Sequence, residues 1–223
     1  MGVIPNLLNS IIYGLGSFSI GLLSVLFITF FFLKDSKLFE NSILAFIANN
    51  SVKRTRNSFS KISDLLSRYF VGLMIQILVL FIIYTIVLLI FGINNAFVIA
   101  FICALMNLIP YVGPLISGFL MMILTMTSNM GASFSEVVIP KTTYVMIGFI
   151  IGQLIDNFVS QPIIFSKSVK SHPLEIFIVI ITSGLLFGVI GMVVAIPTYT
   201  AIKVILKEFL YDYKFVQKLT KDL

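Results

Sequence analysis

The stretch from Gly148 to Pro162, GFIIGQLIDNFVSQP, decides how the rest of the sequence is interpreted. It lies in an apolar segment, residues 142–165, that is long enough to cross a bilayer. Four strongly polar residues interrupt it, and their spacing places all four on one helical face. They are Gln153, Asp156, Asn157 and Gln161. Because a carboxylate at the centre of a membrane helix costs about 2.5–3.5 kcal/mol, this face is predicted to meet protein or water rather than lipid.

Composition places the chain among integral membrane proteins. Of its 223 residues, 59% are hydrophobic and 11% are charged, and the mean hydropathy is +1.10. A soluble domain carries about 25% charged residues. The net charge of +6 comes from basic residues between apolar segments, which is the positive-inside pattern and not a basic face for nucleic acid. The one cysteine, Cys103, lies in an apolar segment and indicates no disulfide framework.

The distribution of charged residues divides the first part of the chain into a membrane span and a polar connection. Residues 1–33 hold a first span, Ile11–Leu33, behind an uncharged lead-in. Residues 34–68 hold seven of the 15 basic residues, together with apolar residues at helical spacing. This pattern predicts two amphipathic helices on the cytoplasmic membrane surface, joined by a turn at Asn49-Asn50-Ser51. The second span is then Tyr69–Phe91.

Residues 96–128 are apolar but are broken at Pro110-Tyr111-Val112-Gly113-Pro114. Each flank has about 14 residues and is about 21 Å long, too short for a hydrocarbon core of about 30 Å. Two prolines and a glycine leave backbone groups without helical partners, and such backbone is tolerated in a membrane only inside protein or beside a wet cavity. We expect a re-entrant hairpin here; the alternative is a single kinked span.

A second interrupted segment follows near the end of the chain. Leu174–Leu210 is broken at Gly188-Val-Ile-Gly191 and contains Pro197 further along. A basic tail follows it. The expected parts of the chain are therefore 1–33, 34–68, 69–128, 129–210 and 211–223.

Charge also predicts the topology. If each broken segment returns to the side from which it enters, Lys167, Lys170 and the C-terminus lie in the cytoplasm with residues 34–68, as the positive-inside rule favours. The halves 69–128 and 142–210, each a span followed by a hairpin, then have opposite orientations. Inverted repeats with interrupted helices meeting near the midplane are a recurring plan of transporters. The expected fold is all-α: a polytopic helical membrane protein with interrupted, re-entrant helices and a possible inverted repeat.

The candidate substrate- or ion-binding residues are the four polar residues named first, together with Asn107, one turn before the first break. Asp156 is the strongest, because acids inside a span mark ion and substrate pathways. The alternative for Asp156 is a structural acid that joins helices, and the amides can likewise serve only to bridge neighbours. The breaks are expected to line the pathway through Pro110, Tyr111, Gly113, Pro114, Gly188, Gly191 and Pro197.

The sequence contains no constellation for catalysis. It has no paired carboxylates or His/Cys cluster with metal-ligand spacing, and no phosphate-binding loop of the form GxxxxGK[ST]. We therefore expect no catalytic residue, metal or cofactor, and the chain is not interpreted as an enzyme.

These motifs resemble the AI-2E (autoinducer-2 exporter) family of bacterial membrane permeases. The resemblance implies secondary transport across a bacterial inner membrane; members have been assigned export of autoinducer-2 or sodium/proton exchange. Members are usually longer upstream, so the chain resembles their later part. The matching motifs are Phe31-Phe-Leu-Lys-Asp35, Asn107-Leu-Ile-Pro-Tyr-Val-Gly-Pro114, Gln153-Leu-Ile-Asp-Asn157 with Gln161-Pro162, Lys167-Ser-Val-Lys-Ser-His-Pro173, Gly184-Leu-Leu-Phe-Gly-Val-Ile-Gly191 and Ala195-Ile-Pro197.

Three functions remain open at this stage. The first is export of a small polar molecule such as autoinducer-2, with a site built by the two breaks and the 153–161 face. The second is cation/proton antiport in which Asp156 alternates between a proton and Na⁺. The third is a non-transporting membrane scaffold that docks partners through residues 34–68. Membrane lipids are partners in each case, and the Gly-x-x-x-Gly faces favour a homo-oligomer.

Overall fold

The structure is a computed structural model that describes residues 3–35, 37–168 and 171–221. Its side chains are described except those of residues 3–12, 15, 18, 39, 50 and 165–168. Every regular element within these ranges is helical, as composition predicted. The elements are α1 (Val3–Lys34), α2 (Leu38–Ala45), η1 (Asn49–Ser51), α3 (Val52–Ile90), α4 (Ala96–Met106), α5 (Val112–Ser128), η2 (Phe134–Val138), α6 (Ile139–Ile155), η3 (Asp156–Ser160), α7 (Gln161–Ser168), α8 (Pro173–Phe209) and α9 (Lys214–Leu219).

The chain divides into two compact units, Met1–Phe59 and Ser60–Leu223, and each is described by itself. The first unit holds α1, which contains the expected first span, followed by α2, η1 and the beginning of α3. The turn expected at Asn49–Ser51 is present as η1. Within this unit the Arg56 Nε atom lies 3.3 Å from Glu40 Oε1, so an ion pair joins α2 to the first turns of α3.

Helix α3 runs through the boundary expected between residues 68 and 69 without any interruption. Its 39 residues make a rod about 58 Å long, nearly twice the hydrocarbon thickness of about 30 Å. The amphipathic helix and the second span are therefore one element, of which only part can lie in a bilayer. In the described part of the chain, three helical segments are long and apolar enough to cross a membrane: Val52–Ile90, Phe134–Ile164 and Pro173–Phe209.

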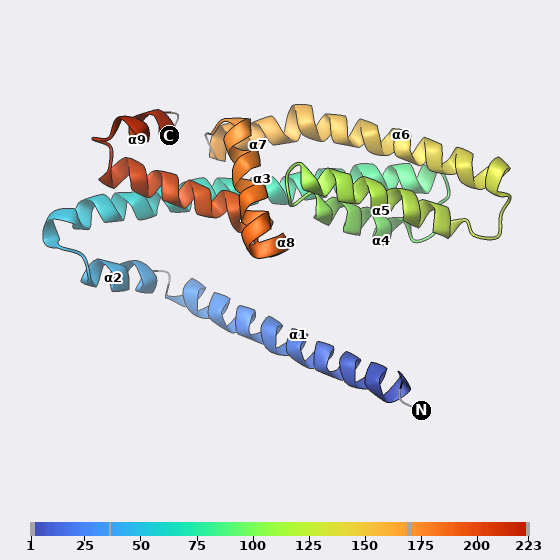
Figure 1. Ribbon diagram of the computed structural model, residues 1–223, viewed down its shortest axis with the longest axis horizontal. Helices are drawn as coiled ribbons and strands as arrows, with labels where there is room; N and C mark the ends of the chain where they lie inside the picture. Colours follow the sequence, from blue (N-terminus) through green and yellow to red (C-terminus); the bar gives the residue numbers. More distant parts are fainter. Residues whose placement is uncertain (1–2, 36, 169–170, 222–223) are drawn as a thin grey trace. The chain divides into compact units, whose positions relative to one another are not determined.

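Helices α4 and α5 form an antiparallel hairpin, which we call the first hairpin (Figure 1). The backbone N–H of Asn94 donates to Ser128 Oγ at 3.0 Å, so the start of α4 lies beside the end of α5. Nearer the break, the Cys103 thiol donates to the Ser117 carbonyl oxygen at 3.6 Å. The segment is thus interrupted at the expected position and folds back, and the alternative of one kinked span is wrong.

The turn of the first hairpin depends on two unusual positions. Tyr111 has φ +66° and ψ −48°, a conformation that costs a non-glycine residue about 1–3 kcal/mol unless its surroundings enforce it. Gly113 approaches the backbone of Met106 so closely that a Cβ atom would collide with the Met106 carbonyl oxygen. The Gly113 N–H donates to the Ile109 carbonyl oxygen at 2.8 Å, so two of the backbone groups that the break would leave without helical partners pair with each other within the turn.

The second hairpin, residues 171–209, is built in a similar way. Helix α8 is interrupted at Gly188, with φ +63° and ψ −149°. A Cβ atom at Gly191 would collide with the Ser183 carbonyl oxygen. At the open end, the Tyr199 hydroxyl donates to Glu175 Oε2 at 3.0 Å.

The same open end holds a buried cation. Lys203 Nζ donates to Ser171 Oγ at 2.9 Å and lies 3.5 Å from Glu175 Oε2. Its side chain is 1% exposed, so this lysine joins the two arms from within the packed interior. Pro197, which we expected to add a further break, lies inside α8 where the backbone stays helical, so that expectation is wrong. Lys167 and Lys170, on which the topology argument depended, lie outside the described side chains.

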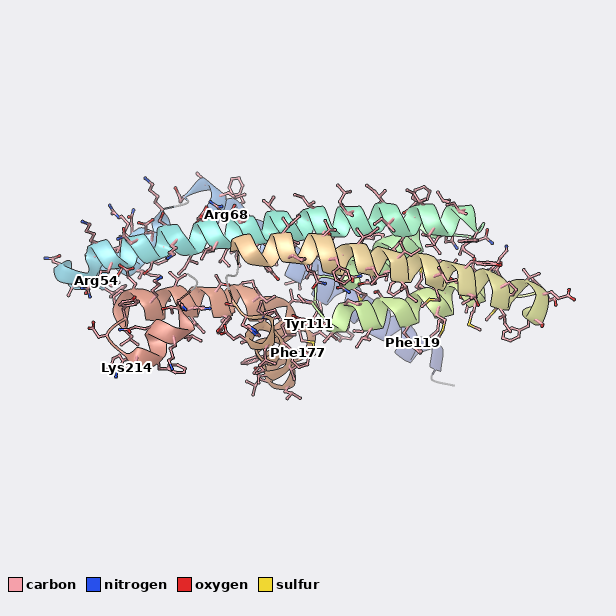
Figure 2. All side chains as sticks on the ribbon, turned by 90° about the horizontal axis from the view of Figure 1, so that it is seen from above. Arg54, Arg68, Tyr111, Phe119, Phe177 and Lys214 are labelled. Carbon is pink, nitrogen blue, oxygen red and sulfur yellow. The ribbon has the colours of Figure 1, made fainter. Side chains whose placement is uncertain are left out.

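The two hairpins meet at the middle of the second unit. The ring of Tyr111, in the turn of the first hairpin, packs edge-on against Phe177 of the second, with centroids 5.6 Å apart (Figure 2). Ile109, Ile176 and Ile196 are buried in the same apolar cluster. From this contact the first hairpin extends toward the C-terminal end of α3, while the second arm of α8 extends the opposite way along α3. The inverted repeat stays a prediction.

Replacing Gly191 by Ala tests the second turn. Its new Cβ would meet a backbone carbonyl that cannot move aside, so we expect a loss of about 1–3 kcal/mol in unfolding free energy. Gly21→Ala is the matched control, because no atom lies within 4 Å of that Cβ position. Thermal unfolding in detergent measures both. Equal melting temperatures for the two variants would show that the turn does not need glycine at 191.

Candidate functional site

The stretch that opened the sequence analysis is not a regular α-helix throughout. Helix α6 ends at Ile155, and residues Asp156–Ser160 form the π-helical turn η3 before α7 begins. A π-helical turn has one residue more per hydrogen-bonded loop, and such turns occur often at functional sites. The acid therefore lies where the helix widens.

Asp156 is completely buried, and its carboxylate is held from two helices. The Gln76 side chain of α3 donates from Nε2 to Asp156 Oδ2 at 2.9 Å. Gln161 donates from Nε2 to the same oxygen at 3.0 Å. The other oxygen, Oδ1, is buried without a hydrogen-bond partner, and no ion pair in the described part of the chain includes Asp156.

Gln153 forms a second buried node, one turn earlier. Its Nε2 atom donates to the Tyr84 hydroxyl at 2.6 Å and to Asn107 Oδ1 at 2.8 Å. Asn107 in turn donates to the Cys103 carbonyl oxygen at 2.8 Å. Gln153 Oε1 is buried and unpartnered, like Asp156 Oδ1. Gln153 therefore links α3, α6 and the first hairpin, and leaves one acceptor free.

These side chains come together because glycines leave little side-chain volume between α6 and α3. A Cβ atom at Gly148 would lie 2.7 Å from Val87 Cγ2, and one at Gly152 would lie 3.1 Å from the Tyr84 ring. Glycines on α6 thus let its backbone approach α3 closely enough for amide side chains to reach across. We call the resulting set the polar cluster; its members are Gln76, Tyr84, Asn107, Gln153, Asp156 and Gln161.

The polar cluster includes most, but not all, of the residues that the sequence predicted to act together. Gln153, Asp156 and Asn107 are buried, and Gln161 is half-buried. Asn157 is exposed, and its Oδ1 only accepts a hydrogen bond from Gln161 at 2.8 Å.

The break residues occupy two different surroundings. In the first hairpin, Pro114 accepts a hydrogen bond from Ser117 Oγ at 3.2 Å, and this hydroxyl lies 3.3 Å from Asn107 Nδ2. The turn with Pro110, Tyr111 and Gly113 therefore adjoins the polar cluster. In the second hairpin, no side-chain hydrogen bond among the described residues connects Gly188, Gly191 or Pro197 to Asp156.

Sequence reasoning missed several residues of the structure's buried polar set. Gln76 gave a signal, because it is the one strongly polar residue of residues 69–91. Tyr84 gave none, since an aromatic residue in an apolar helix is usually lipid-facing or core. Lys203 gave none either, and only the fold shows that it is buried against Glu175.

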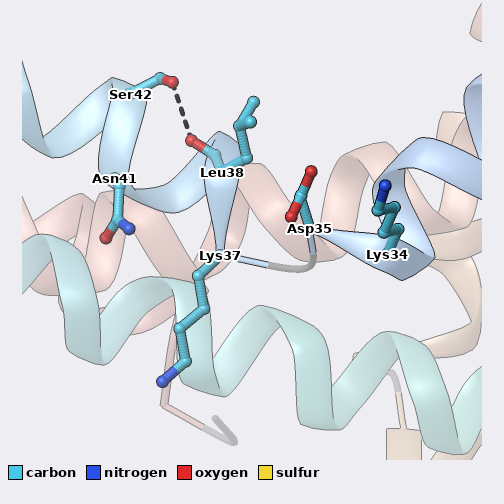
Figure 3. A pocket seen from close by; sticks show the side chains of 6 residues that line it. All are labelled: Lys34, Asp35, Lys37, Leu38, Asn41 and Ser42. Atoms are coloured by element: carbon cyan, nitrogen blue, oxygen red, sulfur yellow. Dashed lines mark hydrogen bonds between the residues drawn. The ribbon is translucent and has the colours of Figure 1, made fainter.

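An open hollow lies in the other unit of the chain. It has a volume of about 680 Å³ and belongs to the first unit, at the connection between α1 and α2 (Figure 3). It contains no member of the polar cluster and is open to its surroundings, so size alone does not indicate the site. Its lining residues are Lys34, Asp35, Lys37, Leu38, Asn41 and Ser42.

The polar cluster offers oxygen atoms that can accept hydrogen bonds or bind hard cations, together with side-chain amide groups that donate hydrogen bonds from fixed positions. Asp156 Oδ1 and Gln153 Oε1 can accept from a protonated or hydroxylated substrate, or coordinate an alkali cation. In the described residues no group of three or more His, Cys, Asp or Glu side chains could hold a metal ion.

A polytopic all-α membrane protein with broken helices and a buried polar cluster is a class shared by many transport proteins. The family model for AI-2E family transporters matches residues 1–211, so the chain belongs to that family. It is 27% identical to the "Putative transport protein YrrI" and 28% identical to YueF, similarly named, both of Bacillus subtilis strain 168. These alignments cover 82% of this chain and 50% and 47% of the relatives.

A more distant relative is MJ1177 of Methanocaldococcus jannaschii, again named a transport protein, at 25% identity over 82% of this chain and 53% of its own length. The chain thus spans about half the length of the curated relatives that it matches. No solved structure matches it.

Gln76→Leu tests whether the amides support the carboxylate. Losing the Gln76 donor to a buried Asp156 should lower the unfolding free energy by about 1–3 kcal/mol. Removing the acid as well, in Gln76→Leu/Asp156→Leu, should recover part of this loss, because no unsatisfied carboxylate then remains. Thermal unfolding in detergent compares the variants. A double variant no more stable than the single one would refute this account of the cluster.

Proposed function

We propose that this chain is a secondary membrane permease that moves a small polar molecule or ion through the polar cluster. The observation that carries the proposal is the burial of Asp156 with one carboxylate oxygen unpartnered, at a widened helical turn. An ionisable group is costly inside a span and is retained where it serves transport. Membership of the AI-2E transporter family supports the same class of function.

The hairpins supply the movable parts of this proposal. The first hairpin is tied to α6 through Asn107 and Gln153, and its turn carries a strained Tyr111 packed on the second hairpin. A shift of one hairpin against the other would therefore change the surroundings of the cluster. In this proposal both hairpins are re-entrant and together open the site to alternate sides of the membrane.

Our preferred cargo is a small polar molecule such as autoinducer-2, carried outward. The cluster offers both donors and acceptors, as recognition of a hydroxylated molecule needs. The second candidate, cation/proton antiport, is favoured by a specific observation: the unpartnered atoms of the polar cluster, Gln153 Oε1 and Asp156 Oδ1, are both oxygens, and one belongs to a carboxylate. The scaffold alternative has support only from the basic content of residues 34–68.

Location and assembly complete the proposal. We infer a bacterial inner-membrane protein with residues 34–68 and the C-terminus in the cytoplasm, because the basic residues gather there. A homo-oligomer is part of the proposal, but the Gly-x-x-x-Gly face of α6 would not form its interface, because Gly148 and Gly152 pack against α3 within the chain.

Asp156→Asn in reconstituted vesicles tests the role of the acid. With a pH-sensitive dye inside and Na⁺ or K⁺ added outside, the antiporter candidate predicts a proton flux that the variant loses, because an amide cannot exchange a proton for a cation. Asp64→Asn is the matched control, since Asp64 is an exposed acid that pairs with Arg68 on α3. Absence of flux in folded wild-type protein would eliminate antiport.

Efflux of labelled autoinducer-2 from cells separates the remaining candidates. The exporter candidate predicts efflux that Asn107→Leu and Gln153→Leu both reduce by an order of magnitude or so, because each leaves buried partners unsatisfied in the site. Charge reversal of Arg54 and Arg56 should leave efflux unchanged. A scaffold would show the opposite pattern, with partner binding lost only on charge reversal.

A further inference from the structure

Residues 209–221, which run from the last residue of α8 through α9, have an unusual surface. Five large apolar or aromatic side chains are 39–73% exposed, and Asp212 and Lys214 lie between them in the sequence. The five are Phe209, Leu210, Tyr211, Tyr213 and Phe215. Figure 2 shows Lys214 at the outer edge of this part of the molecule. The sequence alone had suggested only a basic cytoplasmic tail.

This segment is nevertheless fixed to the rest of the second unit. Helix α9 packs on α8, with Val216 5% exposed and Thr220 completely buried. Lys207 Nζ donates to the Thr220 carbonyl oxygen at 3.4 Å. With Val216 and Thr220 facing inward at i and i+4, Phe215 lies on one flank of the helix and Gln217 on the other. A defined face, rather than a free tail, is therefore presented outward.

The chemistry of that face is typical of a membrane–water interface. Aromatic rings concentrate at the headgroup level, and lysines extend from apolar stems toward lipid phosphates. The face begins where the apolar helix α8 ends, at Phe209. Charges along it favour an anionic leaflet: Lys207, Lys214, Lys218 and Lys221 outnumber Glu208 and Asp212.

We propose that residues 209–221 lie flat in the interface of an anionic leaflet and anchor the second hairpin there. Because Lys203, Glu175 and Ser171 tie both arms of α8 one to two turns before this segment, the anchor fixes the open end of the hairpin at that leaflet. The first hairpin opens at the other end of α3, so the two hairpins would enter from opposite leaflets. The partner is the lipid surface itself, and the proposal does not depend on which cargo is carried.

A single tryptophan tests the proposal, because the chain contains none. Phe215→Trp and Gln217→Trp place the same fluorophore on opposite flanks of α9. In vesicles of phosphatidylcholine and phosphatidylglycerol, we expect Phe215→Trp to emit at shorter wavelength and to be quenched several-fold more strongly than Gln217→Trp by brominated lipid. Bromine near the headgroup end of the acyl chain should quench more than bromine near its middle.

Changing the charge of the lipid surface provides a second test. The difference between the two positions should shrink in pure phosphatidylcholine or high salt, and in Lys214→Gln/Lys218→Gln, but persist in Lys214→Arg/Lys218→Arg. Water-like emission from Phe215→Trp would overturn the proposal, as would blue-shifted emission that no brominated lipid quenches, since the latter means that protein covers the face. Equal quenching at both positions would also overturn it.

Discussion

The rest of the structure depends on one requirement, the stabilisation of a carboxylate inside an apolar bundle. A charge without water needs donors of fixed geometry, and Asp156 obtains them from Gln76, 80 positions earlier in the chain, and from Gln161 after the widened turn. Those bonds require α3 and α6 to approach closely, which Gly148 and Gly152 permit. The glycines that looked like an outer packing face therefore serve the interior, and the site and the packing are one arrangement.

The hairpins solve a related problem for the backbone. Ending a helix inside a membrane leaves carbonyl and amide groups without partners, and each must be paired or surrounded by protein. The first turn does both, since Gly113 bonds to Ile109 and the turn is buried against the second hairpin. In the second turn Gly188 takes the conformation that a side chain would oppose. Both breaks therefore contain a glycine, Gly113 or Gly191, at which a Cβ atom would collide with a backbone carbonyl oxygen.

Sequence patterns sufficed for features that arise locally. The break at residues 110–114, the turn at residues 49–51 and the polar face around Asp156 all follow from residue types within a few positions of one another. Features that depend on distant partners were not readable in the same way. The sequence could not show that Tyr84 binds Gln153 or that Lys203 is buried, because both depend on helices far apart in the chain. Residue type also misled at Pro197, which lies inside α8 with the backbone helical around it.

The π-helical turn has a consequence in evolutionary terms. Such a turn holds one residue more than the α-helical turn it replaces, so it is what a single-codon insertion into an ordinary helix leaves behind. The extra residue is taken up within the turn, so the helix on either side keeps its register. Deleting one codon between Asp156 and Ser160 would restore the α-helix and leave the later residues facing much as they do now, but it would change which side chains of the turn lie beside Gln76 and Gln161. A polar turn can thus be gained or lost in this helix without reorienting the last third of the molecule.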